Sequence, residues 1–520
     1  MRRTTPLVLL LPLLLGTVAP VAASQDERTS APAGTAAPAT RSAPSPRQVL
    51  DRAVALLTPD AAAARRGSAP LPRTEATLAL RDLRVVLPEL GAADRRTATS
   101  LLARPTDGRA DLQGQGYSTR ATQRCRGHFC VHWVRSTSDR ATSGQVDTTL
   151  AVMKRVWRTE VGRLDYRAPV SDGVLRRSQN GGNGRFDVYL ADLGAEGLYG
   201  YCAPEFSLRA EPRRAGGYCV LDNDFSQAEF GRPPAESLAV TAAHEFFHAV
   251  QFGYDYREDR WFMESTATWV EERYADDVDD NRQYLAASQV KRPGTSLDLF
   301  DRGGFAHYGN WVFWEHLTER LDAGVVRDTW DAARGSAYSL QALEKVLRPH
   351  GGLTKRYADF AAANLTPSRS YDEGADWPAQ AMSQPTSWTF SADGDRRADE
   401  VGIDHLASSS YVLRPSGLTG AGWRMTVAVD GPSSGSSPAA WVVVRTKDGD
   451  WSSQQLPLDD RGRGEVEVPF SADDVVAVSV TLANASTRSR CGRQLAQWSC
   501  QGQPRDQDKE FALSATVSRR

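Results

Sequence analysis

The chain has 520 residues, of which 41% are hydrophobic and 24% charged, a composition typical of globular rather than disordered or fibrous proteins. This length allows two or three domains with cores of their own. The formal net charge is -2, which gives no reason to expect nucleic acid or a membrane surface as a partner.

Residues 1–23 have the features of a secretory signal peptide. Arg2 and Arg3 precede a short apolar run at residues 7–15, and small residues offer a cleavage site near Ala23. The run is too short to cross a membrane, and no later segment approaches a membrane span. We therefore expect a secreted, extracellular protein.

Two further stretches precede the first strand. Residues 24–46 are rich in Ala, Pro, Ser and Thr, which is typical of a flexible leader. Residues 47–115 show a helical spacing of Leu and Val. Two alternatives are open for this helical N-terminal segment: a pro-region that is removed, or a retained structural subdomain.

The cysteines agree with an oxidising compartment. Six are present, in three close pairs: Cys125 with Cys130, Cys202 with Cys219, and Cys491 with Cys500. An even number in a secreted chain indicates disulfides, and because each pair brackets a short loop we expect pairing within each. A thiolate zinc site is disfavoured, since no CxxC spacing occurs and free thiols are oxidised outside the cell.

Residues 116–385 predict an α+β domain. Alternating apolar runs predict strands at residues 129–134, 186–193 and 218–225. Helical periodicity predicts helices at residues 146–161, 236–252, 259–274, 311–321, 325–333, 340–347 and 353–365. Gly253 is expected to end the helix before it.

Residues 386–520 lose the helical signal. Short alternating runs between turn signals predict strands at residues 411–413, 423–429, 441–445, 464–469, 475–482 and 511–517. That spacing favours a β-sandwich, which could contact a glycan or the cell wall.

The run from His244 to His248, HEFFH, is the strongest chemical motif. Two histidines four apart on a helix share one face, so both can bind one zinc ion. Glu245 can then act on a zinc-activated water as general base, and pass the proton to the leaving amine. The alternative is a pair of partly buried helix histidines without a metal.

A second motif follows. Glu264 comes 16 residues after His248, in the string WFMESTATWVE that ends at Glu271. HEFFH with this string resembles the glutamate-type zincins, the gluzincins, which include thermolysin and the large zinc aminopeptidases. The resemblance implies a thermolysin-like catalytic domain, with Glu264 as the third zinc ligand and Glu271 orienting a ligand histidine. The alternatives are a carboxylate favoured by the helix dipole for Glu264 and a solvated surface acid for Glu271.

The longer string VTAAHEFFHAVQFGYD is similar to a family of secreted bacterial zinc metalloproteases. Further matches are VHW at residues 131–133, FDVYL at 186–190 and YGNW at 308–311. This resemblance covers residues 125–365.

The oxyanion of peptide hydrolysis needs a donor besides the metal. Tyr308 is our first candidate and His307 the second, because related zincins place a Tyr or His downstream in this role. Packing in the core is the alternative for Tyr308.

Two weaker patterns involve other ligands. Calcium could bind at Asp222, Asn223 and Asp224, or at residues 180–183 with Asp187, but neither fits a calcium loop and Asx-rich turns explain both. His128 and His132 could share one face of a strand. No acid is correctly placed beside them, so structural histidines are favoured.

Together these patterns predict a secreted zinc metallopeptidase that acts on protein or peptide substrates. An endopeptidase is favoured, since no GxMEN string that would hold a substrate amine occurs upstream of Glu236. The main alternative is a catalytically silent zincin-fold scaffold with a glycan- or protein-binding β-sandwich. A hydrolase of a non-peptide bond is a third candidate.

Overall fold

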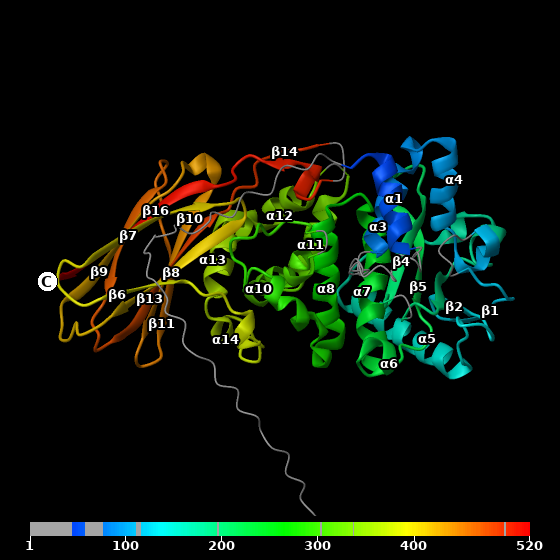
Figure 1. Cartoon of the computed structure of the whole chain (residues 1–520), viewed down its shortest axis with the longest axis horizontal. Coiled ribbons are helices and arrows are strands. Elements are labelled where there is room, and N and C mark those ends of the chain that lie inside the picture. The colour runs from blue at the N-terminus through cyan, green and yellow to red at the C-terminus, as the bar shows by residue number, and fades with distance from the viewer. Residues whose placement is uncertain are drawn as a thin grey trace, which may run out of the picture. The chain divides into compact units, whose positions relative to one another are not determined.

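The computed structural model of the chain describes residues 44–57, 76–110, 116–194, 197–301, 304–335, 337–492 and 496–520. The expected signal peptide and the leader up to residue 43 lie outside these residues. The described part is an α+β structure with helices and several sheets, which confirms the predicted class (Figure 1). No helix in this part is long and apolar enough to cross a membrane.

A five-stranded mixed sheet lies at the centre of the first half of the chain. Its strands are β1 (Thr122–Arg126), β2 (Phe129–Trp133), β3 (Phe186–Ala191), β4 (Gly200–Ser207) and β5 (Ala215–Asp222). Their order is β1-β2-β3-β5-β4. The neighbours β2, β3 and β5 are parallel, whereas β4 is an antiparallel edge strand. The three predicted strands correspond to β2, β3 and β5, while β4 carried no predicted strand.

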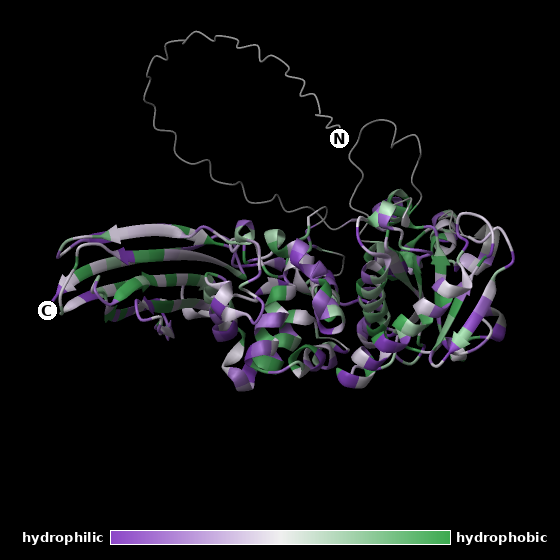
Figure 2. Cartoon of the chain, turned by 90° about the horizontal axis from the view of Figure 1, so that it is seen from below, coloured by the Kyte–Doolittle hydropathy of each residue, from purple (hydrophilic) through white to green (hydrophobic). Residues whose placement is uncertain are grey.

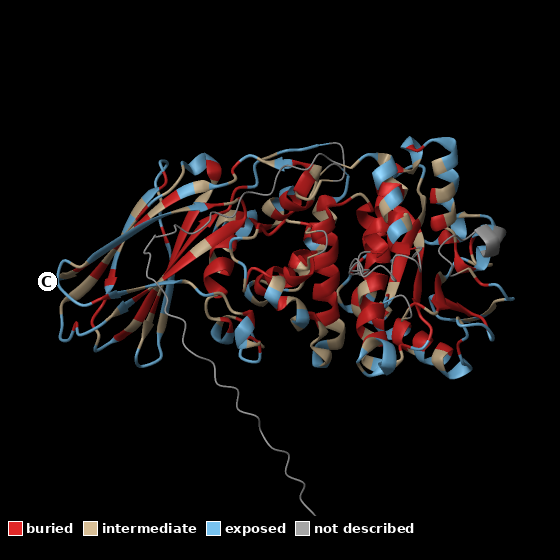
Figure 3. Ribbon diagram, viewed as in Figure 1, coloured by how far each residue is buried: buried red, intermediate tan, exposed pale blue. Residues whose placement is uncertain are grey.

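Helix α5 (Ser143–Trp157) connects β2 to β3 and is followed by a π-helical turn. Helix α7 (Pro234–Asp255) lies along β4 and β5, and α8 (Arg260–Ala275) packs against α7 (Figure 1). Both long helices are buried over most of their length (Figure 3). A helix buried on nearly all sides belongs to a core, so α7 and α8 are placed rigidly.

The expectation that Gly253 ends its helix is wrong. Helix α7 continues to Asp255 and is capped by Tyr256. Tyr254 is buried, and the Asp255 carboxylate pairs with Arg213 and accepts the backbone N–H of Arg257. These tertiary contacts extend the helix past a residue that ends many helices.

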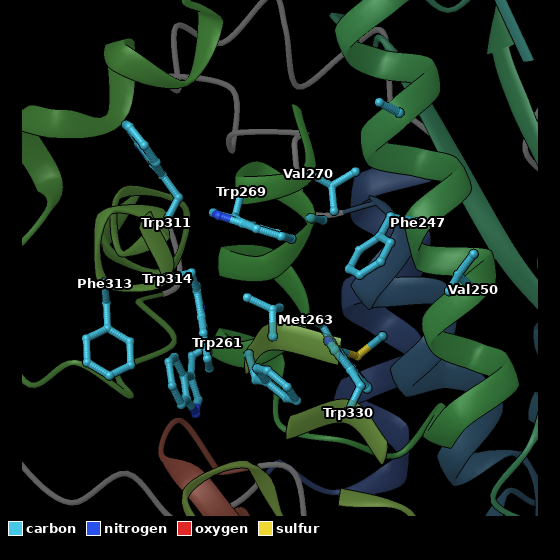
Figure 4. Packing of buried hydrophobic residues seen from close by; sticks show 14 of the residues in the cluster. Phe247, Val250, Trp261, Met263, Trp269, Val270, Trp311, Phe313, Trp314 and Trp330 are labelled. Atoms are coloured by element: carbon cyan, nitrogen blue, oxygen red, sulfur yellow. The ribbon is translucent and has the colours of Figure 1, made fainter. Parts of the chain in front are cut away.

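Aromatic residues pack around α8. Five tryptophans of this region are fully buried: Trp261, Trp269, Trp311, Trp314 and Trp330. The ring of Trp330 stacks on Phe262 with centroids 4.2 Å apart, and Trp261 stacks on Trp314 at 5.9 Å. Figure 4 shows Phe247 and Val250 of α7 on one side of α8, and Trp311 and Trp314 on the other. Trp261 and Trp269 lie on α8, Trp311 and Trp314 on α10 (Trp311–Arg320), and Trp330 on α11 (Gly324–Ala333). The other helices of this region are α9 (Ala306–Gly309), α12 (Ser339–Leu347) and α13 (Gly352–Ala363).

The N-terminal helices cover the second face of the five-stranded sheet. They are α1 (Pro46–Leu57), α3 (Ala76–Val86) and α4 (Ala92–Leu101). Their leucines share one core with Tyr189, Tyr201 and Tyr218 of the sheet. The sheet is thus buried on both faces, by these helices on one side and by α5 and α7 on the other.

The C-terminal part contains two sheets that share one hydrophobic core. One has the order β11-β10-β13-β8-β6 and the other β12-β9-β16-β7. The bounds are β6 (Thr386–Phe390), β7 (Arg396–Ile403), β8 (Ala407–Pro415), β9 (Trp423–Asp430), β10 (Pro438–Thr446), β11 (Trp451–Leu456), β12 (Arg463–Pro469), β13 (Val475–Asn484) and β16 (Lys509–Arg519). Hydrophobic and hydrophilic residues alternate along these strands (Figure 2). The inward residues of both sheets, such as Val480 and Leu513, form the core.

All six cysteines form disulfides, and the predicted local pairing is confirmed: Cys125–Cys130, Cys202–Cys219 and Cys491–Cys500. Cys202 and Cys219 face each other across β4 and β5. Disulfides of this kind are consistent with an extracellular or periplasmic protein.

The loop closed by Cys491–Cys500 joins the C-terminal part to the helices. The backbone N–H of Cys500 donates to Asp259 at 3.0 Å, and that of Ser499 donates to Asp298 at 3.0 Å. The other oxygen of Asp298 lies 2.7 Å from His405 Nε2. The indole N–H of Trp261 donates to Ser499 Oγ at 2.8 Å.

The His405–Asp298 pair predicts a pH-dependent stability. Burial alone lowers the pKa of His405, but Asp298, with Gln507 and Asp404, outweighs it and raises that pKa above its usual value. A raised folded-state pKa adds stability that is complete below the unfolded pKa of about 6.5 and disappears as pH rises through the folded value. The free energy of unfolding of the wild-type protein should therefore decrease as the pH rises. The His405→Gln variant should show a smaller decrease, because it lacks the contribution of this histidine. Denaturant titrations of both proteins across this range test it, and identical pH dependences would contradict it.

Candidate active site

The three expected zinc ligands converge on one point. His244 Nε2 lies 3.1 Å from His248 Nε2 and 3.2 Å from Glu264 Oε2, and the His248 Nε2 to Glu264 Oε2 distance is 3.6 Å. The histidines are one turn apart on α7, and Glu264 comes from the second turn of α8. The packing of α8 on α7 therefore brings together donor atoms that all lie within 4.8 Å of one another.

Hydrogen bonds on the outer ring nitrogens orient both histidines. Gln251 donates through Nε2 to the Met263 carbonyl at 2.8 Å and to Thr266 Oγ1 at 3.2 Å. Its Oε1 must then accept from His248 Nδ1, at 2.8 Å. Glu271 Oε1 lies 2.6 Å from Nδ1 of His244 and holds it in the same way. With each Nδ1 donating outward, a neutral ring would present the lone pair of its Nε2 to the centre.

Two lone pairs and a carboxylate oxygen at such distances repel one another unless a proton or a metal ion lies among them. Two imidazole nitrogens and one carboxylate oxygen form the donor set of many catalytic zinc sites. Glu264 Oε1 is also buried and has no hydrogen-bond partner among the residues described. The residues present therefore fit a zinc ion.

The pKa values show how strongly these groups are coupled. Burial alone raises the pKa of Glu264, but His248 and His244 outweigh it and hold that pKa well below its usual range. Burial lowers the pKa of His244, yet Glu264 and Glu271 raise it well above its usual value. Without a metal the cluster thus retains a proton, and a cation would take that proton's place. Burial raises the pKa of Glu271 to about 7, against the opposing effect of His244.

Glu245, the expected general base, lines a cavity of about 150 Å³. The lining comprises Gly197, Leu198, Tyr199, Gly200, Val240, Thr241, His244, Glu245, Glu271, Asp280, Gln283, Tyr284, Phe305 and Tyr308. Glu245 Oε2 accepts a hydrogen bond from Thr77 Oγ1 at 2.7 Å. The cavity therefore borders both one expected ligand, His244, and the expected base.

The two oxyanion candidates lie differently. Tyr308 lines the cavity, and its ring stacks beside that of His244 with centroids 6.0 Å apart. His307 is fully buried against Phe300 and does not line the cavity. Burial lowers the pKa of His307 to about 4, so its ring is neutral at physiological pH. Of the two, Tyr308 alone borders the space beside the ligands.

The weaker patterns have structural partners. His132 bonds to Asp187 at 2.8 Å, whereas His128 stacks on Trp157 at 3.9 Å, so the two histidines serve different contacts. Asp222 lies close to the carboxylates of Asp224 and Glu229. Its two oxygens already accept four backbone N–H groups, those of Leu193, Gly194, Asp224 and Phe225. Asx-type turns account for this acidic group.

The sequence did not predict two residues that contact the site, Gln251 and Thr77. Gln251 follows His248 by three residues, and that spacing places it on the same face of α7, which could have suggested it. Thr77 lies 168 residues before Glu245 and has no local pattern that could reveal it.

The chain matches no known protein-family model, and no curated protein sequence matches it. Among solved structures, the periplasmic inhibitor PliG of g-type lysozyme from Aeromonas hydrophila is 16% identical, with a TM-score of 0.15, over 26% of this chain and all of that chain. A family GH115 4-O-methyl-α-glucuronidase specific for decorated arabinogalactans is 7% identical, with a TM-score of 0.14, over 58% of this chain and 46% of that chain. Neither likeness carries an argument about the fold or the activity.

Proposed function

We propose that this chain is a secreted zinc-dependent metallopeptidase that cleaves internal peptide bonds. The observation that carries the proposal is the convergence of His244 Nε2, His248 Nε2 and Glu264 Oε2, with both outer ring nitrogens engaged by hydrogen-bond acceptors. A general base beside this donor set, facing a cavity, is the arrangement that metal-assisted hydrolysis requires.

The chain's own residues would divide the chemistry as follows. His244, His248 and Glu264 would hold the zinc ion, which would supply Lewis acidity to polarise a carbonyl oxygen and lower the pKa of water. Glu245 accepts the proton of the attacking water and delivers it to the leaving nitrogen. Tyr308 borders the cavity and would donate its hydroxyl proton in a hydrogen bond to the developing oxyanion. Glu271 keeps the His244 ring in its ligating orientation.

The proposal includes a fold of the glutamate-zincin type. Its support is the motif helix α7, the ligand helix α8 packed across it, and the edge strand β4 beside them. It also takes the two C-terminal sheets as a β-sandwich, for which the shared core is the support. Secretion is proposed from the sequence features of residues 1–23, and the three disulfides are consistent with it.

Metal analysis and casein hydrolysis test the proposal directly. The purified protein should contain about one zinc per chain, lose hydrolysis of casein in a chelator, and regain it when zinc is restored. Glu264→Gln should lower zinc content and activity together, because it removes the anionic ligand. Glu272→Gln is the matched control, since Glu272 lies on the same helix and bonds to Asn281 rather than to the ligands. Wild-type protein without zinc, or hydrolysis that survives the chelator, would contradict the proposal.

A further inference from the structure

Thr77 links the N-terminal helices to the proposed general base. It lies in the first turn of α3 and is buried. Its hydroxyl donates to Glu245 Oε2 at 2.7 Å and accepts the backbone N–H of Cys202 at 2.9 Å. The direction of this chain is forced, because the N–H can only donate and a carboxylate can only accept. Hydrogen bonds in such a row polarise and strengthen one another.

The Cys202 N–H, which donates to Thr77, is itself held in place. Cys202 lies on the edge strand β4, opposite Cys219 of β5, and is joined to it by a disulfide. Facing residues of an antiparallel pair either bond to each other or turn their N–H groups away from the partner strand. The Cys202 N–H points away from β5 and donates to Thr77. The Cys202 sulfur also lies 2.8 Å from the carbonyl oxygen of Glu245.

The N-terminal segment is anchored to the rest of the fold, which favours its retention over its removal. Asp82 of α3 pairs with Arg260 at the start of α8 at 2.9 Å. Tyr218 of the sheet donates its hydroxyl proton to the Ala103 carbonyl at 2.7 Å. Arg104, only 4% exposed, pairs with Asp187 of β3. Loss of this segment would expose the apolar face of the sheet and leave buried carboxylates unpaired.

We propose that Thr77 is a positioning residue for Glu245, and that the helical N-terminal segment, which supplies Thr77, stays in the mature protein. The inference rests on the proposed peptidase function. Because Thr77 engages Oε2, the carboxylate cannot rotate freely, and Oε1 remains for the attacking water. The Cys202–Cys219 disulfide thus fixes the partner of Thr77, and Thr77 in turn orients the Glu245 carboxylate.

Three threonine variants of the full chain test the role of the hydroxyl. Thr77→Val keeps the shape but removes the hydroxyl, and should lower kcat for a casein-derived peptide between about 10- and 100-fold at unchanged KM and zinc content. Thr77→Ser should restore turnover to near the wild-type rate. Thr329→Val is the control, because Thr329 is equally buried but, among the residues that the structure describes, bonds only to the Val325 carbonyl within α11. Turnover by Thr77→Val at or above the wild-type rate would overturn the inference.

Two further measurements test the inference without relying on catalytic activity. Hydrogen exchange of the Cys202 amide should be faster in Thr77→Val than in wild type or Thr77→Ser, and equal exchange in all three would refute the contact. The intact mass of the mature protein should include residue 77, and an active form that lacks it would refute retention. A zinc-loaded wild-type protein that hydrolyses no peptide would instead overturn the proposed function, and the exchange data would still decide the Thr77 contact.

Discussion

Replacing Glu245 with glutamine is expected to lower kcat by about 10²- to 10⁴-fold while the zinc content stays at the wild-type level. The amide cannot accept the proton of the attacking water, but it keeps the size of the carboxyl group and its hydrogen bond from Thr77. The proposed zinc ligands come from other positions, so the metal should stay. Zinc analysis and steady-state kinetics on one preparation give both numbers.

Glu236→Gln is the matched control for this experiment. Glu236 lies in the first turn of α7, far along the helix from the ligands, and does not line the cavity. It should turn over substrate at the wild-type rate. Equal activity of Glu245→Gln and wild type would rule out Glu245 as the base and favour the scaffold alternative.

The largest loss of stability is expected from Arg104→Met. The Arg104 guanidinium is buried and lies 2.9 Å from Asp187, 3.1 Å from Asp172 and 2.7 Å from Glu205. Methionine fills part of the space but leaves three carboxylates without their common cation. Breaking a buried ion network in this way costs about 3–5 kcal/mol of unfolding free energy. Denaturant unfolding of both proteins measures the loss.

The deficit of Arg104→Met should also depend on pH. Burial raises the pKa of Asp172 to about 7 even though Arg104 opposes it, and without the arginine that pKa should rise further. A carboxylate with a raised folded pKa destabilises the fold as pH increases, so the deficit should be smaller at about pH 5 than at about pH 8. Arg124→Met is the control: its exposed pair with Asp147 is worth less than about 1 kcal/mol. A similarly small loss in Arg104→Met would contradict the prediction.

Local patterns predicted the elements that carry the ligands. The spacing of His244 and His248 requires only helical periodicity, and the α8 string supplied Glu264 because the resemblance covers it. Strand β4 was not predicted, since Gly200 and Pro204 interrupt its alternation. A proline within a strand is typical of an edge strand, so Pro204 agrees with the position of β4 at the edge of the sheet.

Other features depend on contacts between distant parts of the chain. Strand β7 is rich in exposed charged residues and lacks an apolar alternation, so only its pairing with β16 defines it. The row from Cys202 through Thr77 to Glu245 joins three elements that are far apart in sequence. Periodicity reports the face that a residue presents, but not which residue meets it there.

The loop closed by Cys491–Cys500 has a consequence for how the protein unfolds. Ser499 accepts the indole N–H of Trp261, which lies one turn of α8 before Glu264. Asp259 and Asp298 take their backbone donors from the same loop. The C-terminal part thus supplies hydrogen-bond partners to α8, which carries the proposed ligand Glu264. Separating the C-terminal part from α8 would leave buried polar groups without hydrogen bonds. We therefore expect the proposed metal centre and the C-terminal sheets to unfold together as one cooperative unit.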